Sequence, residues 1–473
     1  MSEPRDIYSP ERRTALLITG TGADGAYHAG ALRALHEAGV KLDIVGGRGM
    51  GAFSAVLAAV DGGAQLWEAG GYWRGREVSE LYRWRWPLRV LRSLAAALVV
   101  VFLAPLLVVT LVAIVYPVAL ILGMAGLDAG AQVMQAFLAS LSAAFAPAAL
   151  PTWIPRAIAL LAGAGLVLLT AGALLAEWRA PLRRRSAGAY GWALVGSPID
   201  AGVAISRAID GLWRLLKGGA ALKTPEPHDL SRRYAELLTE NLGQPGFREL
   251  LLVIHDLDAQ RDMVFGLVRE PYRKMLFPPP GAVSNRRAEA HDLSNGTQAF
   301  TADVVAAALS LPAVTDPRLI RFAPDSYWRG ETHRFTDRPA CIGRLIEEAA
   351  AAGAEQVVVI SAASEPPGPH ELRPSRRDGF GKIGEQFASA ESSALADAVR
   401  HLHHRFQGVY LIRPAHNPIR ALDLIGAYDD RSDRVQTLDE LMERGYEDAY
   451  RQFIEPVLGA SGDRMTQVNR ENG

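Results

Sequence analysis

The 473-residue sequence has only one cysteine, Cys341, and almost no net charge. A single cysteine cannot form an intramolecular disulfide, so a disulfide-stabilised fold is excluded and a reducing compartment is indicated. Lysine and arginine (50 residues) nearly balance aspartate and glutamate (51 residues), which leaves a net charge of −1. This balance provides no overall positive field that would attract nucleic acid. The first residues, MSEPRDIYSPERR, are polar and predict no secretion signal.

Charge is missing from one long stretch of the chain. Residues 93–155 contain no lysine or arginine, and their only charged residue is Asp128. A membrane-spanning helix needs about 20 apolar residues, and the segments 93–115 and 154–177 meet this requirement. We therefore predict an inserted membrane hairpin over residues 86–186, with two or more transmembrane helices. The alternative is a hydrophobic hairpin buried in a soluble protein.

Arginines flank this apolar block on both sides. Those before the first predicted crossing are Arg83, Arg85, Arg89 and Arg92, and those after the second are Arg179, Arg183, Arg184 and Arg185. The positive-inside rule then places both long polar segments in the cytoplasm and the loop between the crossings outside. We expect an integral protein of the inner or plasma membrane, in contact with membrane lipids.

The rest of the chain alternates between strand and helix patterns. Residues 14–60 twice show an apolar strand, a glycine-rich turn and a helix, which is typical of a parallel α/β sheet. The alternation resumes after the apolar block, so residues 14–85 and 187–460 are predicted to form one α/β domain, followed by a disordered tail over 461–473. The predicted strands are 15–19, 44–46, 355–363 and 409–412, with a strand and its hairpin partner within 247–265. The predicted helices include 301–314, with Thr301 as its N-cap, then 342–352 and 381–406, and surface loops are predicted over 278–297 and 364–378.

The first glycine-rich turn follows the strand 15–19 and reads Gly20-x-Gly22-x-x-Gly25. This spacing matches a dinucleotide-binding fingerprint, in which backbone N–H groups at a helix start face a pyrophosphate. The acidic residue that such a site needs is absent from its usual place, because Asp43 precedes the second strand rather than following it. The same N–H groups are equally suited to an oxyanion hole.

The second turn has the outline of a nucleophile elbow. Such an elbow presents a catalytic serine in a G-x-S-x-G frame between a strand and a helix. Here the frame reads Gly47-Arg48-Gly49-Met50-Gly51, and a glycine stands at the serine position.

An oxyanion-type loop, a helix, a strand and an elbow within the first 51 residues resemble the patatin-like phospholipase family. The helix AYHAGALRALHEAG is close to the family pattern, and residues 311–339 resemble the segment that ends in the family's catalytic Asp-Gly turn. The resemblance implies an α/β, three-layer domain with a mainly parallel sheet, interrupted here by the inserted transmembrane helical hairpin. It also implies an acyl hydrolase with a Ser–Asp dyad.

The positions that the resemblance assigns to catalysis have changed. The family's serine falls on Gly49, its aspartate falls on Arg329, which precedes Gly330, and the basic residue of its oxyanion loop falls on Asp24. Without a hydroxyl no acyl-enzyme forms, and without a base none is activated. Four residues were weighed as substitutes and each is more simply explained as an ordinary structural residue: Ser54, Thr21, Asp325 and Asp337.

These changes predict a pseudoenzyme that acts in lipid binding, scaffolding or regulation, as a homo-oligomer or beside an active relative. No cofactor and no metal site are predicted. Arg48 and Arg329 could converge on an anionic headgroup, or they could form salt bridges to Asp24. Two other hypotheses remain: an active membrane-bound lipid acyl hydrolase with a displaced catalytic residue, and a nucleotide-binding sensor based on the first glycine-rich turn.

Overall fold

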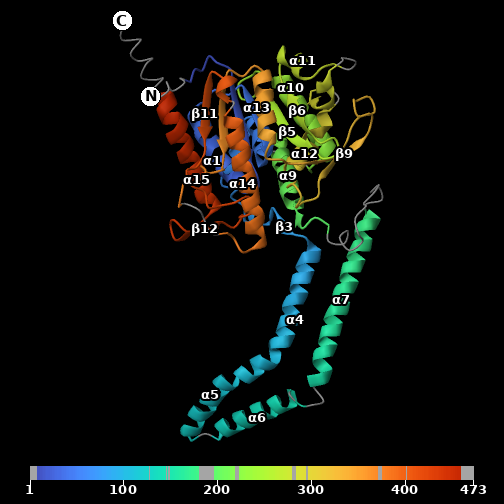
Figure 1. Ribbon diagram of the computed structural model, residues 1–473, viewed down its shortest axis with the longest axis vertical. Helices are drawn as coiled ribbons and strands as arrows, with labels where there is room; N and C mark the ends of the chain where they lie inside the picture. Colours follow the sequence, from blue (N-terminus) through green and yellow to red (C-terminus); the bar gives the residue numbers. More distant parts are fainter. Residues whose placement is uncertain are drawn as a thin grey trace. The chain divides into compact units, whose positions relative to one another are not determined.

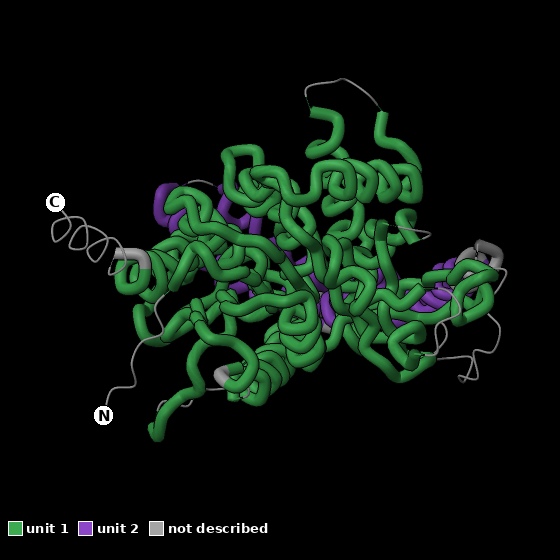
Figure 2. Tube along the Cα trace, turned by 90° about the horizontal axis from the view of Figure 1, so that it is seen from above, with its two compact units in different colours: residues 1–83, 199–473 green, residues 84–198 purple. Residues whose placement is uncertain are grey.

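The protein is described by a computed structural model that covers residues 8–126, 128–144, 146, 150–179, 196–218, 223–279, 284–294, 297–370, 375–400 and 402–459. Contacts between Cα atoms divide the chain into two units (Figure 2). Unit 1 contains residues 1–83 and 199–473, and unit 2 contains residues 84–198. The second unit is therefore somewhat longer than the predicted insertion, 86–186. The predicted tail, 461–473, lies outside the described residues.

Unit 1 is built on a nine-stranded, mainly parallel sheet, so the expected α/β class is confirmed. Its main order is β11 (Gly408–Ile412), β10 (Gln356–Ser361), β1 (Thr14–Gly20), β2 (Ile44–Gly49), β5 (Glu249–Asp256), β6 (Arg261–Leu267) and β7 (Ala290–Asp292). The strands from β11 to β5 are parallel, whereas β6 runs antiparallel to β5. A hairpin of β8 (Arg318–Arg321) and β9 (Thr332–Thr336) joins through β9, which pairs antiparallel with the end of β5.

Helices cover both faces of this sheet and give three layers (Figure 1). On one face, Leu17 of β1 and Val359 of β10 are buried in a cluster with α13 (Cys341–Ala351) and α14 (Gly379–Val399). The other face is covered by α1 (Asp24–Glu37), α2 (Met50–Ala58) and α12 (Thr301–Ala308). Central strands buried on both faces explain the continuous apolar runs in the sequence, and each fully buried Leu or Val contributes about 1.5–3 kcal/mol.

The remaining elements of this part of the chain surround the three layers. Their bounds are α3 (Ala64–Trp67), α9 (Gly202–Lys217), α10 (Pro227–Asn241), α11 (Tyr272–Leu276), α15 (Leu438–Ala449), the π-helical η5 (Tyr450–Gly459), and the short strands β3 (Arg83–Trp84), β4 (Ile199–Asp200), β12 (Ala427–Asp429) and β13 (Arg434–Gln436). Single 3-10 turns are η1 (Arg76–Glu80), η2 (Asn285–Ala288), η3 (Gln298–Phe300) and η4 (Leu402–His404).

The predicted strands and the hairpin within 247–265 are confirmed as β1, β2, β10, β11 and the pair β5–β6. The predicted helix at Thr301 is present, but it ends at Ala308 and its N-cap is Phe300. Part of the predicted loop 278–297 is wrong, because β7 continues the sheet there in parallel with β6. A three-residue edge strand is too short to produce a readable alternation in the sequence.

Unit 2 is helical. It contains α4 (Trp86–Thr110), α5 (Val112–Met124), α6 (Ala129–Ala144) and α7 (Leu150–Arg179), and the Arg85 N–H donates to the Pro198 carbonyl at 3.0 Å. The first predicted crossing, 93–115, is divided between α4 and α5 at Leu111, and Pro117 lies inside α5 rather than at the break. Across the described parts of these helices, none combines the length and apolarity that a membrane crossing requires. The predicted transmembrane helices are therefore not confirmed.

Candidate functional site

The elbow predicted at residues 47–51 exists as backbone. Strand β2 ends at Gly49, whose φ of 56° and ψ of −137° fall in a region that is essentially open only to glycine, and α2 begins at the next residue. A Cβ on Gly47 would lie 2.2 Å from the Gly51 carbonyl oxygen, and one on Gly51 would lie 2.2 Å from that of Ile18. Gly47 and Gly51 are therefore required by close backbone contact, whether or not the turn carries a nucleophile at position 49.

Asp337, rather than Arg329, is the residue that lies beside Gly49. A Cβ on Gly49 would lie 2.8 Å from the Asp337 Oδ2 atom and 2.3 Å from the Gly20 carbonyl oxygen. Asp337 directly follows β9, whereas Arg329 is exposed in the turn between β8 and β9. The structure therefore does not support the assignment of the missing aspartate to Arg329, eight positions before Asp337. That assignment depended on Gly330, and this glycine, with a φ of 81°, belongs to the hairpin turn.

Arg48 fills the space next to the elbow. Its side chain is fully buried, and its Nη1 donates to the Asp337 Oδ2 atom at 2.9 Å. Its Nη2 is paired with Glu391 of α14, and its Nε donates to the Thr19 hydroxyl at 2.8 Å. The expected convergence of Arg48 with Arg329 does not occur, and the ion-pair partners of Arg48 are Asp337 and Glu391 rather than Asp24.

The hydroxyl groups of Thr21 and Ser54, which could replace the missing serine, are both engaged. The Thr21 hydroxyl donates to the Glu391 Oε1 atom at 2.6 Å and lies 3.3 Å from the Asp337 Oδ2 atom. The Ser54 hydroxyl lies 3.4 Å from the Met50 carbonyl oxygen of its own helix. Thr21 is therefore the hydroxyl that the fold brings to the carboxylate beside the elbow.

Two N–H groups of the first glycine-rich turn already have partners within the chain. The Thr21 N–H donates to the Asp24 Oδ2 atom at 2.7 Å, and the Ala23 N–H donates to the Ala421 carbonyl at 2.8 Å. Gly22 has a φ of 59°, and a Cβ on it would lie 1.9 Å from the same Ala421 oxygen. The Ala421 carbonyl oxygen thus accepts the hydrogen bond that the Ala23 N–H could otherwise donate to an oxyanion or a pyrophosphate oxygen. The Thr21 and Ala23 N–H groups are therefore not available to an oxyanion or a pyrophosphate.

Burial perturbs the charged groups of the site. Burial raises the pKa of Asp337 to about 6, although Arg48 opposes this shift. Burial and the nearby Glu391 raise the pKa of Asp24 to about 7. Burial disfavours the charged form of Arg48, but Asp337 and Glu391 outweigh it and raise its pKa. His28, which packs behind the loop, has its pKa lowered by burial to about 3 and is therefore neutral.

A small cavity adjoins the network. A cavity lined by Asp24, Glu391 and Arg420 has a volume of about 20 Å³, which is enough for roughly one water. Among the described side chains, no group of three or more His, Cys, Asp or Glu is placed to hold a metal ion. The arrangement holds charge in a fixed position beside Gly49.

Sequence reasoning missed the two residues that close the site. Glu391 lies in the middle of α14 among small polar residues, and no local pattern marks it as a partner of Arg48. Ala421 acts through its backbone carbonyl, which no side-chain pattern reveals. Asp337 was visible as an acidic residue directly after the strand-like segment THRFT, at the carboxyl end of β9.

Comparisons with known proteins give local similarity only, and no protein-family model matches the chain. A stretch of 50 residues, 11% of this chain, is 48% identical to lysophospholipase nte1 of Emericella nidulans, and it covers 3% of that protein. The crystal structure of VipD from Legionella pneumophila aligns with 94% of this chain and 67% of its own, at 13% identity and a TM-score of 0.32. A TM-score this low establishes neither a shared fold nor a shared activity with VipD. The similarity to nte1 is limited to one short stretch of a much longer protein.

Proposed function

We propose that this chain is a catalytically inactive protein of the patatin-like type, which associates with membrane lipid and acts in lipid binding, scaffolding or regulation. The observation that carries the proposal is Gly49. The strand–turn–helix that would present a nucleophile has no side chain at its apex, and Arg48 with its two carboxylates occupies the adjoining space.

Three further features support inactivity. Asp337 is in the position of a base, but it is committed to a buried ion pair with Arg48. The Ala23 N–H donates to the Ala421 carbonyl instead of remaining available to a tetrahedral intermediate. The cavity at the network has room for roughly one water. Each feature alone would slow acyl transfer, and together they engage the base and an oxyanion donor and leave little space in the adjoining cavity.

Lipid association is proposed from the surface of unit 2. Large apolar side chains are exposed along its helices, and soluble monomers rarely expose so many apolar groups in one region. They are Leu91, Val99, Val100, Leu103, Leu107 and Val109 of α4, Ile114, Val118, Leu120, Ile121 and Met124 of α5, Val133 and Leu138 of α6, and Leu160, Leu166, Val167, Leu168 and Leu174 of α7. We propose that these side chains contact the acyl chains of membrane lipids. We further propose that the helices insert across the membrane and that the α/β domain lies in the cytoplasm.

Flotation with liposomes tests lipid association. The full chain should float with phosphatidylcholine vesicles, and a variant in which a short glycine linker replaces residues 84–198 should remain in the soluble fraction. The Arg85–Pro198 hydrogen bond brings the ends of the excised segment together, so a short linker suffices. Resistance of the full chain to carbonate extraction would favour insertion over surface binding. A full chain that does not float would refute the lipid proposal.

An active lipid acyl hydrolase is the second candidate, and the local identity to lysophospholipase nte1 is the observation that favours it. In that case Thr21 would be the nucleophile, because its hydroxyl lies 3.3 Å from the Asp337 carboxylate. Hydrolysis of lysophosphatidylcholine by the purified chain, abolished in Thr21→Val and unchanged in Ser54→Ala, would establish this candidate. We expect no hydrolysis by any of the three proteins.

A further inference from the structure

A second polar region lies at the carboxyl ends of the parallel strands, beside the closed elbow but distinct from it. From β1 the chain moves to β2 on one side, whereas β10 and β11 lie on the other side of β1. The connections therefore diverge between β1 and β10. In open α/β sheets, the crevice at such a divergence is where ligands bind, outside the carboxyl ends of the strands.

The structure has a hollow at this place. It has a volume of about 370 Å³, and its walls come from the segments that follow β10 and β11. The lining residues are Ser364, Glu365, Pro366, Pro367, Ala415, Arg420 and Arg431. Arg420 also lines the small cavity that contains Asp24 and Glu391, so it forms the wall between the hollow and the buried network.

Arg420 is the cation of the hollow that lacks a partner in contact. Its backbone N–H donates to Asp423, but its half-buried guanidinium makes no hydrogen bond or ion pair within the described part of the chain. Burial lowers the pKa of Arg420, and the negative charges of Asp24, Asp423 and Glu385 only partly oppose this. The neighbouring arginines differ, because Arg413 is paired with Glu365 at 2.9 Å and Arg376 is paired with Asp423 at 3.1 Å.

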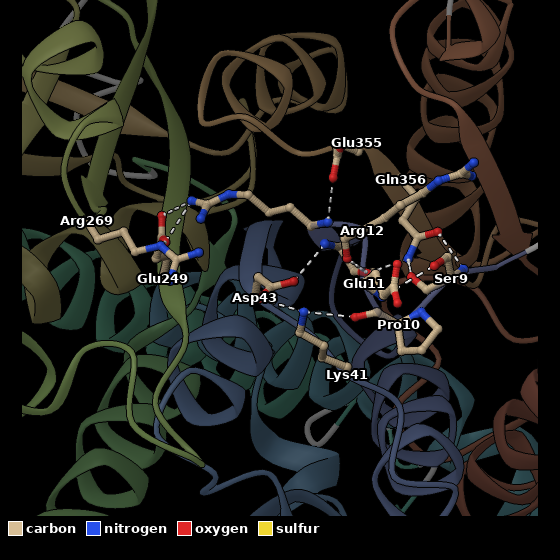
Figure 3. A network of polar contacts seen from close by, with 12 residues as sticks. Ser9, Pro10, Glu11, Arg12, Lys41, Asp43, Glu249, Arg269, Glu355 and Gln356 are labelled. Carbon is tan, nitrogen blue, oxygen red and sulfur yellow. Dashed lines mark hydrogen bonds and ion pairs between the residues drawn. The ribbon is translucent and has the colours of Figure 1, made fainter.

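A hollow of similar size at the opposite end of the sheet shows what a purely structural arrangement looks like. It has a volume of about 340 Å³ and is lined by charged residues at the amino ends of the strands. There, Arg269 is paired with Glu249 at 2.9 Å, and the Lys41 Nζ donates to the Pro10 carbonyl at 2.9 Å (Figure 3). These cations have partners within the chain, so that hollow does not require an external anion.

We propose that the hollow at Arg420 binds an anion of the phosphate class, carried by a phosphomonoester. The planar guanidinium presents its donors in a fork that matches two phosphate oxygens. Arg431 adds positive charge on the same wall, and the Ser364 side chain provides a further polar group. The volume exceeds that of a phosphate ion, which leaves room for the alcohol part of the ester. This inference does not depend on the inactivity of the elbow or on membrane association.

The test is a binding titration of the full chain in detergent, with glycerol 3-phosphate and inorganic phosphate as separate probes. Calorimetry should show saturable binding of at least one probe, weakened tenfold or more in Arg420→Gln, because a charge-assisted bidentate contact is lost. Arg232→Gln is the matched control. Arg232 is an exposed arginine of α10 outside the hollow, 3.9 Å from Asp229, and its variant should bind like the wild type.

A second variant makes the test independent of the folding of Arg420→Gln. Ala415 is an exposed residue in the wall of the hollow, and Ala415→Trp should block the ligand without removing charge. Vesicles of phosphatidic acid, compared with phosphatidylcholine, distinguish a lipid headgroup from a soluble ester. The proposal would be overturned if the full chain bound neither soluble probe and did not bind phosphatidic acid. Wild-type affinity in Ala415→Trp or in folded Arg420→Gln would also overturn it.

Discussion

The replacement Arg48→Met tests the network that closes the elbow. Arg48 is fully buried, and its partners Asp337 and Glu391 have only 1% and 5% of their side-chain surface exposed. Methionine fills a similar length of space but provides no charge. The variant therefore leaves two buried carboxylates without a counterion, and it also removes the hydrogen bond to Thr19.

The expected loss is large. Breaking a buried ion pair by removing one partner costs about 3–5 kcal/mol, which is a substantial part of the 5–15 kcal/mol that stabilises a typical domain. The loss should also depend on pH, because a carboxyl group without Arg48 takes up a proton more readily. The pKa of Asp337 is about 6 in the presence of Arg48, and we expect it to rise further in the variant. The variant should therefore lose more stability at pH 8 than at pH 5.

Urea unfolding followed by circular dichroism at pH 5 and pH 8 measures both effects. Arg334→Met is the matched control, because Arg334 forms a forked contact with Asp258 at 2.6 and 3.0 Å but is 55% exposed. Exposed pairs contribute about 0–1 kcal/mol. A loss below about 1 kcal/mol for Arg48→Met, or an equal loss at the two pH values, would refute the account of the network.

The remaining predictions concern pH and backbone geometry. Because the pKa of Asp337 is raised to about 6, its contribution to stability is fully present below its unfolded pKa and is lost as the pH rises through 6. Burial lowers the pKa values of His28 and His291 to about 3 and 4, so these two groups make the protein more stable as the pH rises over the same range. The effect of Asp337 is therefore measured as the stability of wild type relative to Asp337→Asn. This difference should fall between pH 4 and pH 7. Gly49→Ser should destabilise the protein and produce no esterase activity, because the added Cβ would lie 2.3 Å from a backbone carbonyl and 2.8 Å from the Asp337 Oδ2 atom. Gly22→Ala should cost more than 2 kcal/mol in urea unfolding, because its Cβ would lie 1.9 Å from a carbonyl oxygen.

Each of these variants has a control or an outcome that would contradict the prediction. Gly39→Ala has a similar φ, 63°, but its Cβ would meet nothing within 4 Å, so it isolates backbone strain from the clash, and we expect a cost of about 1 kcal/mol. Equal costs at Gly22 and Gly39 would contradict the contact with Ala421. Esterase activity in folded Gly49→Ser would show that a usable site remains. A relative stability of wild type over Asp337→Asn that rises with pH would contradict the raised pKa of Asp337.

The sequence was sufficient to predict the sheet, the elbow and the first glycine-rich turn. These features depend on local patterns: apolar strands buried on both faces, and glycines that permit close backbone contact at the turns. The glycine at the serine position of a G-x-S-x-G frame, Gly49, was also visible, because the frame fixes that position within five residues.

The partners of Arg48 were not predictable in the same way. Asp337 and Glu391 are separated from Arg48 by 289 and 343 residues, and only the paired strands and the packing of α14 bring them together. Arg329 was expected at the elbow because a glycine in a hairpin turn, such as Gly330, and a glycine after a catalytic aspartate look alike in a sequence. The predicted crossings were inferred from apolarity alone, which does not reveal the break at Leu111 or the arrangement of four helices.

The central claim is that the elbow at Gly49 is closed and catalytically inactive. Its most direct test is intact-mass analysis of the purified full chain after treatment with a fluorophosphonate probe, in parallel with lysophosphatidylcholine hydrolysis. The account predicts no mass addition and no turnover above a heat-inactivated sample. Stoichiometric labelling accompanied by turnover, with both lost in Thr21→Val, would contradict it.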